Sequence, residues 1–222
     1  MICLNRASST SFSIFLLDLS IDLYCFIKCF NTVLMQYFKK IIGSKCYLSP
    51  ISEQDAEKWA EWFTDLEVTI PLGDEAFTPT SVSKERKTIN DFLQSGAHVF
   101  SIVDLKSDEL IGRCMLFGVN TIDRTAKLGI VIGEKSFWNK GYGQDAMRQL
   151  LDYGFNLLNL HNIMLGVYAY NKAAIKCYKN VGFKEIGLRR QVRIVGGKKY
   201  DMLYMDILAD EFTSIYVNKF LS

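Results

Sequence analysis

The spacing of hydrophobic residues changes along the chain, and these changes separate helices from strands. Short apolar or alternating segments between turn-forming residues predict strands, and longer segments with apolar residues three and four positions apart predict helices. The expected strands are residues 46–50, 98–103, 110–119, 125–133, 163–169, 183–195 and 198–207, and the expected helices are 53–63, 83–93, 144–158 and 172–180.

The order of these elements, β-α-α-β-β-β-α-β-α-β-β, predicts the fold class. Antiparallel strands in succession, one strand–helix–strand crossover and a last hairpin at Gly196-Gly197 indicate an α/β fold of the mixed α+β type. Its central sheet is expected to be mostly antiparallel and seven-stranded, with helices on its faces, rather than doubly wound. The chain from Leu208 onward is expected to form a terminal helix.

The first expected helix has a recognisable start. Ser52 is expected to cap it, and Asp55 three residues later gives a near match to a capping box, which has Glu or Gln at that position. One face of this helix is apolar, with Ala56, Trp59, Ala60 and Phe63. The stretch 64–80, rich in Pro, Gly and Thr, is expected to be a loop.

Residues 1–34 differ from the rest of the chain. The segment SFSIFLLDLSIDLYCFIKCF is apolar and aromatic, but Asp18 and Asp22 interrupt it. Carboxylates at these positions disfavour a secretory signal and a membrane span. We expect residues 1–34 to be an N-terminal appendage outside the fold, translated from an over-extended reading frame, and 35–222 to form a single domain. A membrane-contacting helix is the alternative for the appendage.

Composition narrows the functional classes. Apolar residues make up 49% and charged residues 23%, as in a globular protein with a core. The net charge of +2 gives no argument for a nucleic-acid partner. The six cysteines contain no CxxC pair and the two histidines have no zinc-ligand spacing, so we expect free thiols, a reducing cytoplasmic setting and no metal.

A glycine-rich turn, FWNKGYGQDAM at residues 137–147, joins an expected strand to an expected helix. Residues 141–146 match GxGxxA, but the turn follows an antiparallel meander, and no carboxylate lies in 161–165, where a dinucleotide-binding unit would have one. No GK[ST] follows, which excludes a Walker loop. A glycine turn at a helix start suits an anion, especially a phosphate, and Lys140 adds charge. A simple turn is the alternative.

A second motif lies at residues 171–183, where NKAAIKCYKNVGF contains N-x-x-A-x-x-x-Y-x-x-x-G-F. Together with the glycine turn and the order of elements, it resembles the GNAT acetyltransferase superfamily over about residues 45–208. Trp138 stands where Gln or Arg is usual, as in the RimJ/RimL-like and spermidine acetyltransferase-like branch. The resemblance implies an acyl-CoA N-acyltransferase fold whose fourth and fifth strands splay apart around acetyl-CoA.

The resemblance also implies residues that bind acetyl-CoA as co-substrate. The backbone of Val131, Ile132 and Gly133 matches the strand that aligns the pantetheine arm. The pyrophosphate loop is matched by Trp138, Asn139, Lys140, Gly141, Tyr142, Gly143 and Gln144. Asn171 matches a residue that contacts the arm, with a helix N-cap as an equally good and compatible interpretation. Ala174 would keep its helix close to the ligand or would simply pack there.

Tyr178 matches the tyrosine that protonates the departing CoA thiolate, as a general acid. The alternative is a buried tyrosine whose hydroxyl is bonded elsewhere. Cys177 could be a nucleophile, but no histidine lies nearby in sequence, so a packed thiol is the favoured interpretation. Four acidic loop residues are candidate bases or, more simply, solvated charges: Asp65, Glu67, Asp74 and Glu75.

The sequence therefore predicts an N-acetyltransferase that moves the acetyl group of acetyl-CoA to a primary amine by direct attack. A non-catalytic acyl-CoA-binding or interaction module is the alternative. The acceptor is left open among a protein N-terminus, a polyamine and an amino sugar or aminoglycoside. A homodimer is left open by analogy with relatives, and no nucleic-acid partner or membrane span is expected.

Overall fold

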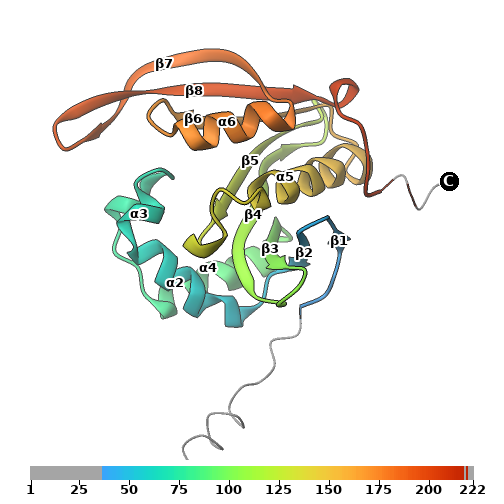
Figure 1. The fold of residues 1–222 in the computed structure, drawn as a ribbon, viewed down its shortest axis with the longest axis horizontal. Coiled ribbons are helices and arrows are strands. Elements are labelled where there is room, and N and C mark those ends of the chain that lie inside the picture. The colour runs from blue at the N-terminus through green and yellow to red at the C-terminus, as the bar shows by residue number, and fades with distance from the viewer. Residues whose placement is uncertain (1–36, 218, 220–222) are drawn as a thin grey trace, which may run out of the picture. The chain divides into compact units, whose positions relative to one another are not determined.

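The structure is a computed structural model that describes residues 37–217 and 219, and its centre is one eight-stranded sheet (Figure 1). The strand order is β1-β2-β3-β4-β5-β6-β8-β7, and every neighbouring pair is antiparallel except β5 and β6. The strands are β1 Ile41–Ile42, β2 Cys46–Pro50, β3 His98–Asp104, β4 Leu110–Asn120, β5 Thr125–Ile132, β6 Asn162–Tyr168, β7 Lys184–Val195 and β8 Lys198–Leu208.

The mixed fold class and the seven expected strands are confirmed, and the eighth strand is an addition. It is β1, whose two isoleucines pair with Leu48 and Tyr47 of β2. Two residues cannot display a period, so the spacing of apolar residues gave no sign of this strand.

The main helices are α2 Ala56–Thr64, α3 Leu66–Thr69, α4 Val82–Ser95, α5 Tyr142–Asp152 and α6 Lys172–Val181. Ser52 and Asp55 form a capping box, in which the Asp55 carboxylate accepts the Ser52 N–H at 3.0 Å. The stretch expected to be a loop contains α3 and a 3-10 turn, η2, at Asp74–Phe77. A π-helical turn, Tyr153–Leu157, continues α5.

The expected terminal helix after Leu208 is wrong for the part that the structure describes, because a 3-10 turn at Ala209–Glu211 forms there and residues 212–217 are not helical. Further on, the Asp152 carboxylate accepts the backbone N–H groups of Ile215, Tyr216 and Val217 at 2.7–3.2 Å. A helix would need these donors for its own carbonyls, so the side chain of α5 takes the backbone hydrogen bonds that would have built it.

Two hydrophobic cores lie on opposite faces of the sheet, because alternate strand residues point to opposite sides. On one face, α5 and α6 cover side chains such as Cys114, Leu128 and Leu165. On the other, α2 and α4 cover side chains such as Tyr47 and Val131. The apolar face of α2 is buried as expected.

The parallel pair β5 and β6 separates after three residue pairs, from Thr125↔Asn162 to Lys127↔Met164. Beyond this point β5 stays paired with β4 as far as Ile132, and β6 stays paired with β8 as far as Tyr168. Each of the two strands therefore has one unpaired edge facing the other, and the sheet opens between them as the resemblance implied.

Among the described residues, no helix is long and apolar enough to cross a bilayer. The prediction that residues 1–34 are an appendage lies outside the described residues.

Candidate functional site

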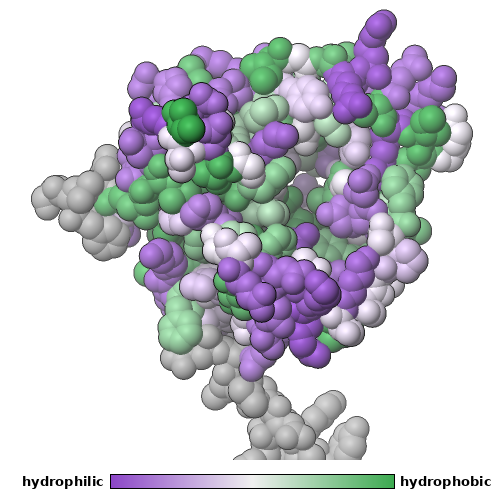
Figure 2. All heavy atoms as spheres, turned by 180° about the vertical axis from the view of Figure 1, so that it is seen from behind, coloured by the Kyte–Doolittle hydropathy of each residue, from purple (hydrophilic) through white to green (hydrophobic). Residues whose placement is uncertain are grey.

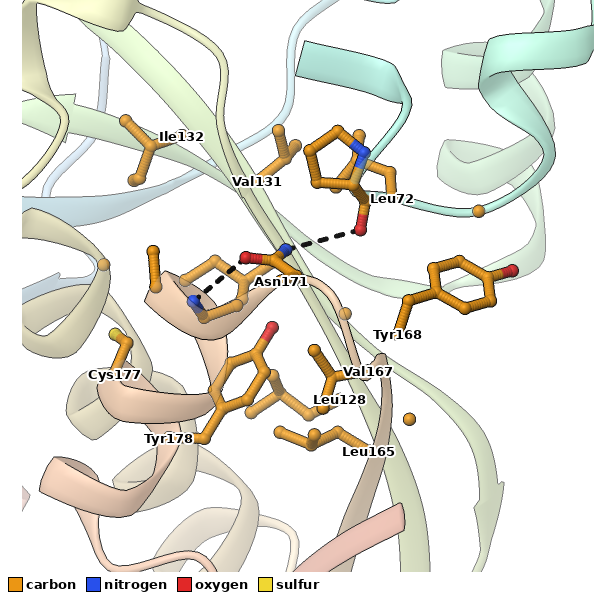
Figure 3. Close-up of a pocket in the computed structure, with 18 of the residues that line it drawn as sticks. Leu72, Leu128, Val131, Ile132, Leu165, Val167, Tyr168, Asn171, Cys177 and Tyr178 are labelled. Atoms are coloured by element: carbon orange, nitrogen blue, oxygen red, sulfur yellow. Dashed lines mark hydrogen bonds between the residues drawn. The ribbon is translucent and has the colours of Figure 1, made fainter. Parts of the chain in front are cut away.

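A cleft of about 1330 Å³ opens where β5 and β6 separate. The strands β4, β5, β6 and β8, the start of α5, the helix α6 and the loop before η2 supply its lining. Figure 2 shows the molecule from behind, where the surface is hollowed near its centre and hydrophilic residues gather beside the hollow. Figure 3 shows the lining from inside.

The N-terminus of α5 opens onto this cleft without a side-chain cap. Gly141 precedes the helix with φ +86°, a conformation that favours glycine, and Asp145 N–H makes the first bond, to Gly141 O at 3.1 Å. The N–H groups of Tyr142, Gly143 and Gln144 are left without an intrahelical acceptor. By contrast, Ser81 caps α4 and Asn171 caps α6. The uncapped donors suit an anion.

Asp145 lies in the first turn of α5, but its carboxylate is directed away from the cleft. It accepts the backbone N–H groups of Ser44, Lys45 and Cys46 at 2.8–3.1 Å. Burial alone would raise the pKa of Asp145, but these hydrogen bonds prevail and hold its pKa below the usual range. The Asp145 carboxylate is thereby bound by residues 44–46, and the positive N-terminal end of α5 stays available in the cleft.

The backbone of β5 has different partners on its two edges. Gly133 N–H donates to Ile111 O of β4 at 2.9 Å, and Trp138 Nε1–H donates to Ile132 O at 2.7 Å. Because the backbone groups of alternate residues point to opposite edges, Ile132 and Ile130 face the unpaired edge, whereas Val131 faces β4. The tryptophan at the place of the usual Gln or Arg thus holds the end of β5. Ile130 lines the cleft and was missed by the sequence analysis.

Asn171 has both of the roles considered for a residue at the start of α6. Its Oδ1 accepts Ala174 N–H at 3.1 Å and caps the helix, while Nδ2 donates to Pro71 O at 3.5 Å (Figure 3). Its side chain also lines the cleft. Capping therefore does not remove Asn171 from the site.

Tyr178 projects from α6 toward the strands that carry Leu128 and Val167 (Figure 3). Its ring lines the cleft, and its hydroxyl has no hydrogen-bond partner among the residues that the structure describes. Among residues 37–217, Tyr178 is therefore not a core tyrosine whose hydroxyl is bonded elsewhere, which was the alternative interpretation. Burial raises the pKa of Tyr178, which keeps the phenol protonated at neutral pH.

Cys177 packs against the core beside α5 and also lines the cleft. Burial raises the pKa of its thiol to about 11, so the thiolate that a nucleophile needs is disfavoured. His98 is occupied elsewhere, with Nδ1 3.0 Å from the Tyr153 hydroxyl. This environment agrees with the prediction that Cys177 is a packed thiol and not a nucleophile.

The four candidate acidic residues divide into two pairs. Asp65 and Glu67 both contact Lys135, at 2.7 and 2.8 Å. Asp74 lies 3.5 Å from Arg193, and Glu75 lies 4.0 Å from Arg113. Only the two glutamates line the cleft.

The cleft brings together eleven of the thirteen residues that the sequence analysis proposed for the site. Lys140 and Gly133 are the exceptions, and Gly133 lies instead against the ring of Trp62, where a Cβ atom would come within 2.0 Å. The eleven are Val131, Ile132, Trp138, Asn139, Gly141, Tyr142, Gly143, Gln144, Asn171, Ala174 and Tyr178.

Arg113 was missed, although the sequence held a signal for it. It is the one charged residue in the apolar stretch 110–119. In the structure it lies in β4 with its guanidinium carbon 4.4 Å from the ring centroids of both Trp59 and Phe63, and it lines the cleft.

Comparisons with known proteins agree with this geometry. The family model described as an acetyltransferase (GNAT) domain matches residues 45–184. The N-acetyltransferase p20 of Bacillus licheniformis is 33% identical over 164 residues, which cover 72% of this chain and 90% of the relative. The spermidine N(1)-acetyltransferase of Vibrio cholerae is 31% identical over 123 residues, 55% of this chain and 70% of the relative.

Solved structures give the same result. The crystal structure of spermidine N-acetyltransferase from Vibrio cholerae in complex with CoA and spermine superposes with a TM-score of 0.69. It is 26% identical, and the match covers 75% of this chain and 96% of that chain. Because the family model spans more than half of the sequence, the chain belongs to the GNAT family, whose members are acetyl-CoA-dependent N-acetyltransferases.

Proposed function

We propose that this protein transfers the acetyl group of acetyl-CoA to the primary amine of a small molecule, with Tyr178 as the general acid. The observation that carries the proposal is the Tyr178 hydroxyl, which is directed into the cleft with no partner among the described residues. A phenol held this way has its proton free for a group that enters the cleft.

The binding of acetyl-CoA is supported by two features of the chain. The first turn of α5 presents the N–H groups of Tyr142, Gly143 and Gln144 without a cap, which suits the pyrophosphate. The unpaired edge of β5 presents the backbone N–H and C=O of Ile130 and the N–H of Ile132. The carbonyl of Ile132 already accepts a hydrogen bond from Trp138. A pantetheine arm has amides that can pair with such an edge as a neighbouring strand does.

The chemistry then follows from the thioester that acetyl-CoA supplies. The neutral amine nitrogen forms a bond to the acetyl carbon, the carbon–sulfur bond breaks, and the phenol of Tyr178 gives its proton to the sulfur. The proton that the nitrogen loses as the amide forms passes to water, and water returns a proton to the Tyr178 phenolate. The raised pKa of Tyr178 keeps the phenol protonated before the thiolate forms, although it also makes the phenol a weaker acid, so the position of its hydroxyl in the cleft carries the assignment. Cys177 takes no part, since its thiol is protonated at neutral pH.

A small-molecule acceptor is favoured by the relatives, among which are the spermidine acetyltransferases of Vibrio cholerae and Escherichia coli. The lining of the cleft also includes four large apolar or aromatic side chains, those of Met115, Phe117, Met202 and Tyr204. Such a lining suits a small molecule with an apolar stem.

Titration of acetyl-CoA into the full chain, followed by thermal unfolding, tests the binding step. A ligand at 100 times its Kd adds about 2.7 kcal/mol to the free energy of unfolding, so the midpoint should rise with acetyl-CoA concentration. CoA release with a panel of amines tests the transfer step. Binding without release for any amine would favour the non-catalytic module, and a well-folded protein with no rise in midpoint would contradict the CoA site.

A further inference from the structure

Arg113 lines the cleft, and the N–H groups of its guanidinium donate no hydrogen bond to the described residues. Its side chain is 14% exposed, and the rings of Trp59 and Phe63 lie against the guanidinium. Among the described residues, no acceptor lies within hydrogen-bond distance of its nitrogen atoms. A guanidinium has five N–H donors, and a largely buried one without acceptors is costly.

Glu75 is the nearest carboxylate, but it does not satisfy Arg113. The two side chains are 4.0 Å apart at their closest atoms, beyond hydrogen-bond distance. The other oxygen of Glu75 accepts the Gly73 N–H at 2.9 Å. Glu75 is therefore a loosely held counter-charge that another carboxylate can displace.

Other charged residues on this side of the cleft are either paired or lie apart from Arg113. Glu67 is paired with Lys135 at 2.8 Å. Lys127 lines the cleft, is exposed, and has no ion pair among the described residues. Lys127 and Val131 lie on the same face of β5 because they are four residues apart. A second carboxylate, the buried Glu85 of α4, also acts on the charge of Arg113, but its printed hydrogen bond is with the Thr80 hydroxyl.

Arg113 and Tyr178 lie on opposite faces of the sheet, and this arrangement sets the direction from which an acceptor would approach. Tyr178 packs with the core under α5 and α6, whereas Arg113 lies on the opposite face, with Trp59 and Phe63 of α2. Arg113 is paired across the sheet with Val131 of β5, so it is one strand, about 4.8 Å, away from β5. An acceptor bound at Arg113 would approach the thioester from the face opposite to Tyr178.

We propose that the acceptor is a small amine that also carries a carboxylate, of the amino-acid type, and that Arg113 binds this carboxylate and so determines specificity. The proposal rests on the acetyl transfer proposed above. A planar guanidinium matches a carboxylate with two parallel hydrogen bonds, and the aromatic rings leave its edge as the polar surface. A polyamine would instead place an ammonium group beside the Arg113 guanidinium, where the like charge disfavours it.

Matched acceptors that differ only in the carboxylate test the proposal: lysine against cadaverine, and ornithine against putrescine. CoA release by the full chain is measured for each, after acetyl-CoA binding has been established on the same sample. We expect kcat/KM for the amino acid to exceed that for the diamine at least tenfold. Equal or better turnover of the diamines, or no turnover of any amino acid by protein that binds acetyl-CoA, would overturn this proposal and leave the CoA site standing.

Variants give the second arm of the test. Arg113→Gln should remove the preference for the amino acid, while the acetyl-CoA Kd stays within twofold of wild type. Arg113→Lys keeps the charge but loses the planar fork, and should raise KM for lysine at least tenfold. Arg86→Gln, which removes an exposed guanidinium on α4, is the matched control and should leave both values unchanged.

Glu75→Gln distinguishes binding from a structural role for Arg113. It removes the competing carboxylate, so KM for lysine should fall. If Arg113 only supported the fold through Glu75, the same change would raise KM for both acceptors or lower the unfolding midpoint. A rise in KM confined to lysine would also contradict the proposal.

Discussion

The two walls of the cleft are built in different ways. The wall that we propose for CoA consists of the first turn of α5, the unpaired edge of β5 and the helix α6, and the first two of these present backbone groups; it is called the CoA wall below. The wall that we propose for the acceptor consists of Arg113, the loop before η2 and residues of β6 and β8, and it presents side chains; it is called the acceptor wall below. One wall is therefore specified by chain geometry and the other by residue identity.

This difference explains why the CoA wall can be predicted from sequence motifs more readily than the acceptor wall. Backbone N–H groups are the same in every protein, so a binding site made from them needs only glycines and spacing that place them correctly. A wall of side chains on loops can change its chemistry without changing the fold. Shared motifs accordingly led to the proposed CoA wall, whereas the acceptor must be inferred from individual contacts.

The walls are nevertheless joined. Asn171 caps α6 and also contacts Pro71 O at 3.5 Å, and the adjacent Tyr170 hydroxyl donates to Ile70 O at 2.6 Å. Farther along the same loop, Asp74 lies 3.5 Å from Arg193 of β7. The start of α6 thus positions the acceptor loop as well as the CoA wall.

Replacing Tyr178 by Phe should have the largest effect. General acid catalysis contributes about 10²–10⁴-fold, so kcat should fall by that order while the acetyl-CoA Kd changes little. Steady-state CoA release and titration of acetyl-CoA measure the two quantities. Tyr153→Phe removes a phenol that is bonded to His98 outside the cleft and should leave kcat unchanged. Equal rates for wild type and Tyr178→Phe would show that Tyr178 is not the acid.

Gly143→Asp should separate binding from folding within the CoA wall. A Cβ atom fits at this position, with Cys177 Sγ at 3.7 Å, and a carboxylate in the first helical turn stabilises α5. The same charge would repel a pyrophosphate, and we expect about 100-fold weaker acetyl-CoA binding, since juxtaposed like charges cost several kcal/mol. Unchanged affinity, with an unchanged unfolding midpoint, would contradict the assignment of the pyrophosphate to this turn.

Asp145→Asn should change stability more than binding. The carboxylate accepts three backbone N–H groups, two in the turn before β2 and one at the first residue of β2, and hydrogen bonds to a charged group contribute about 1.5–3 kcal/mol. Because the folded pKa lies below the ordinary value of 3.8, this contribution is present above that pH and is lost as the pH falls below it.

Urea unfolding of wild type and Asp145→Asn between pH 7 and pH 3 measures this effect. The difference in the free energy of unfolding should shrink as the pH falls. Asp91→Asn, which alters an exposed ion pair with Lys87, is the control and should show almost no difference at either pH. A difference that stays constant with pH would show that the Asp145 charge is not what stabilises the turn.

Lys140→Ala should have the smallest effect. Lys140 was expected to add charge to the pyrophosphate loop, but its side chain does not line the cleft. An exposed charge near a ligand contributes about 0.2–1 kcal/mol, so the acetyl-CoA Kd should rise by no more than about fivefold, and less at high salt. A tenfold or larger rise would mean that Lys140 reaches the pyrophosphate directly.

Particular residues show where prediction from the sequence succeeded. The strands and helices followed from the spacing of apolar residues, because alternate strand positions face separate cores. The glycine turn and the Asn171–Phe183 motif led to the cleft, since both depend on local geometry. The terminal helix was wrong because Asp152, distant in sequence, takes the backbone donors of Ile215–Val217.

The sequence by itself determined the mixed fold and the family, and it pointed to the proposed CoA wall, because periodicity and short motifs are properties of neighbouring residues. Only the tertiary structure decided which side chains line the proposed acceptor wall. Arg113 and Lys127 lie on the consecutive strands β4 and β5, but Glu75 comes from a distant loop, and the distances that decide whether these charges are paired are encoded by no local pattern. The same holds for Tyr178, whose open hydroxyl results from the separation of β5 and β6.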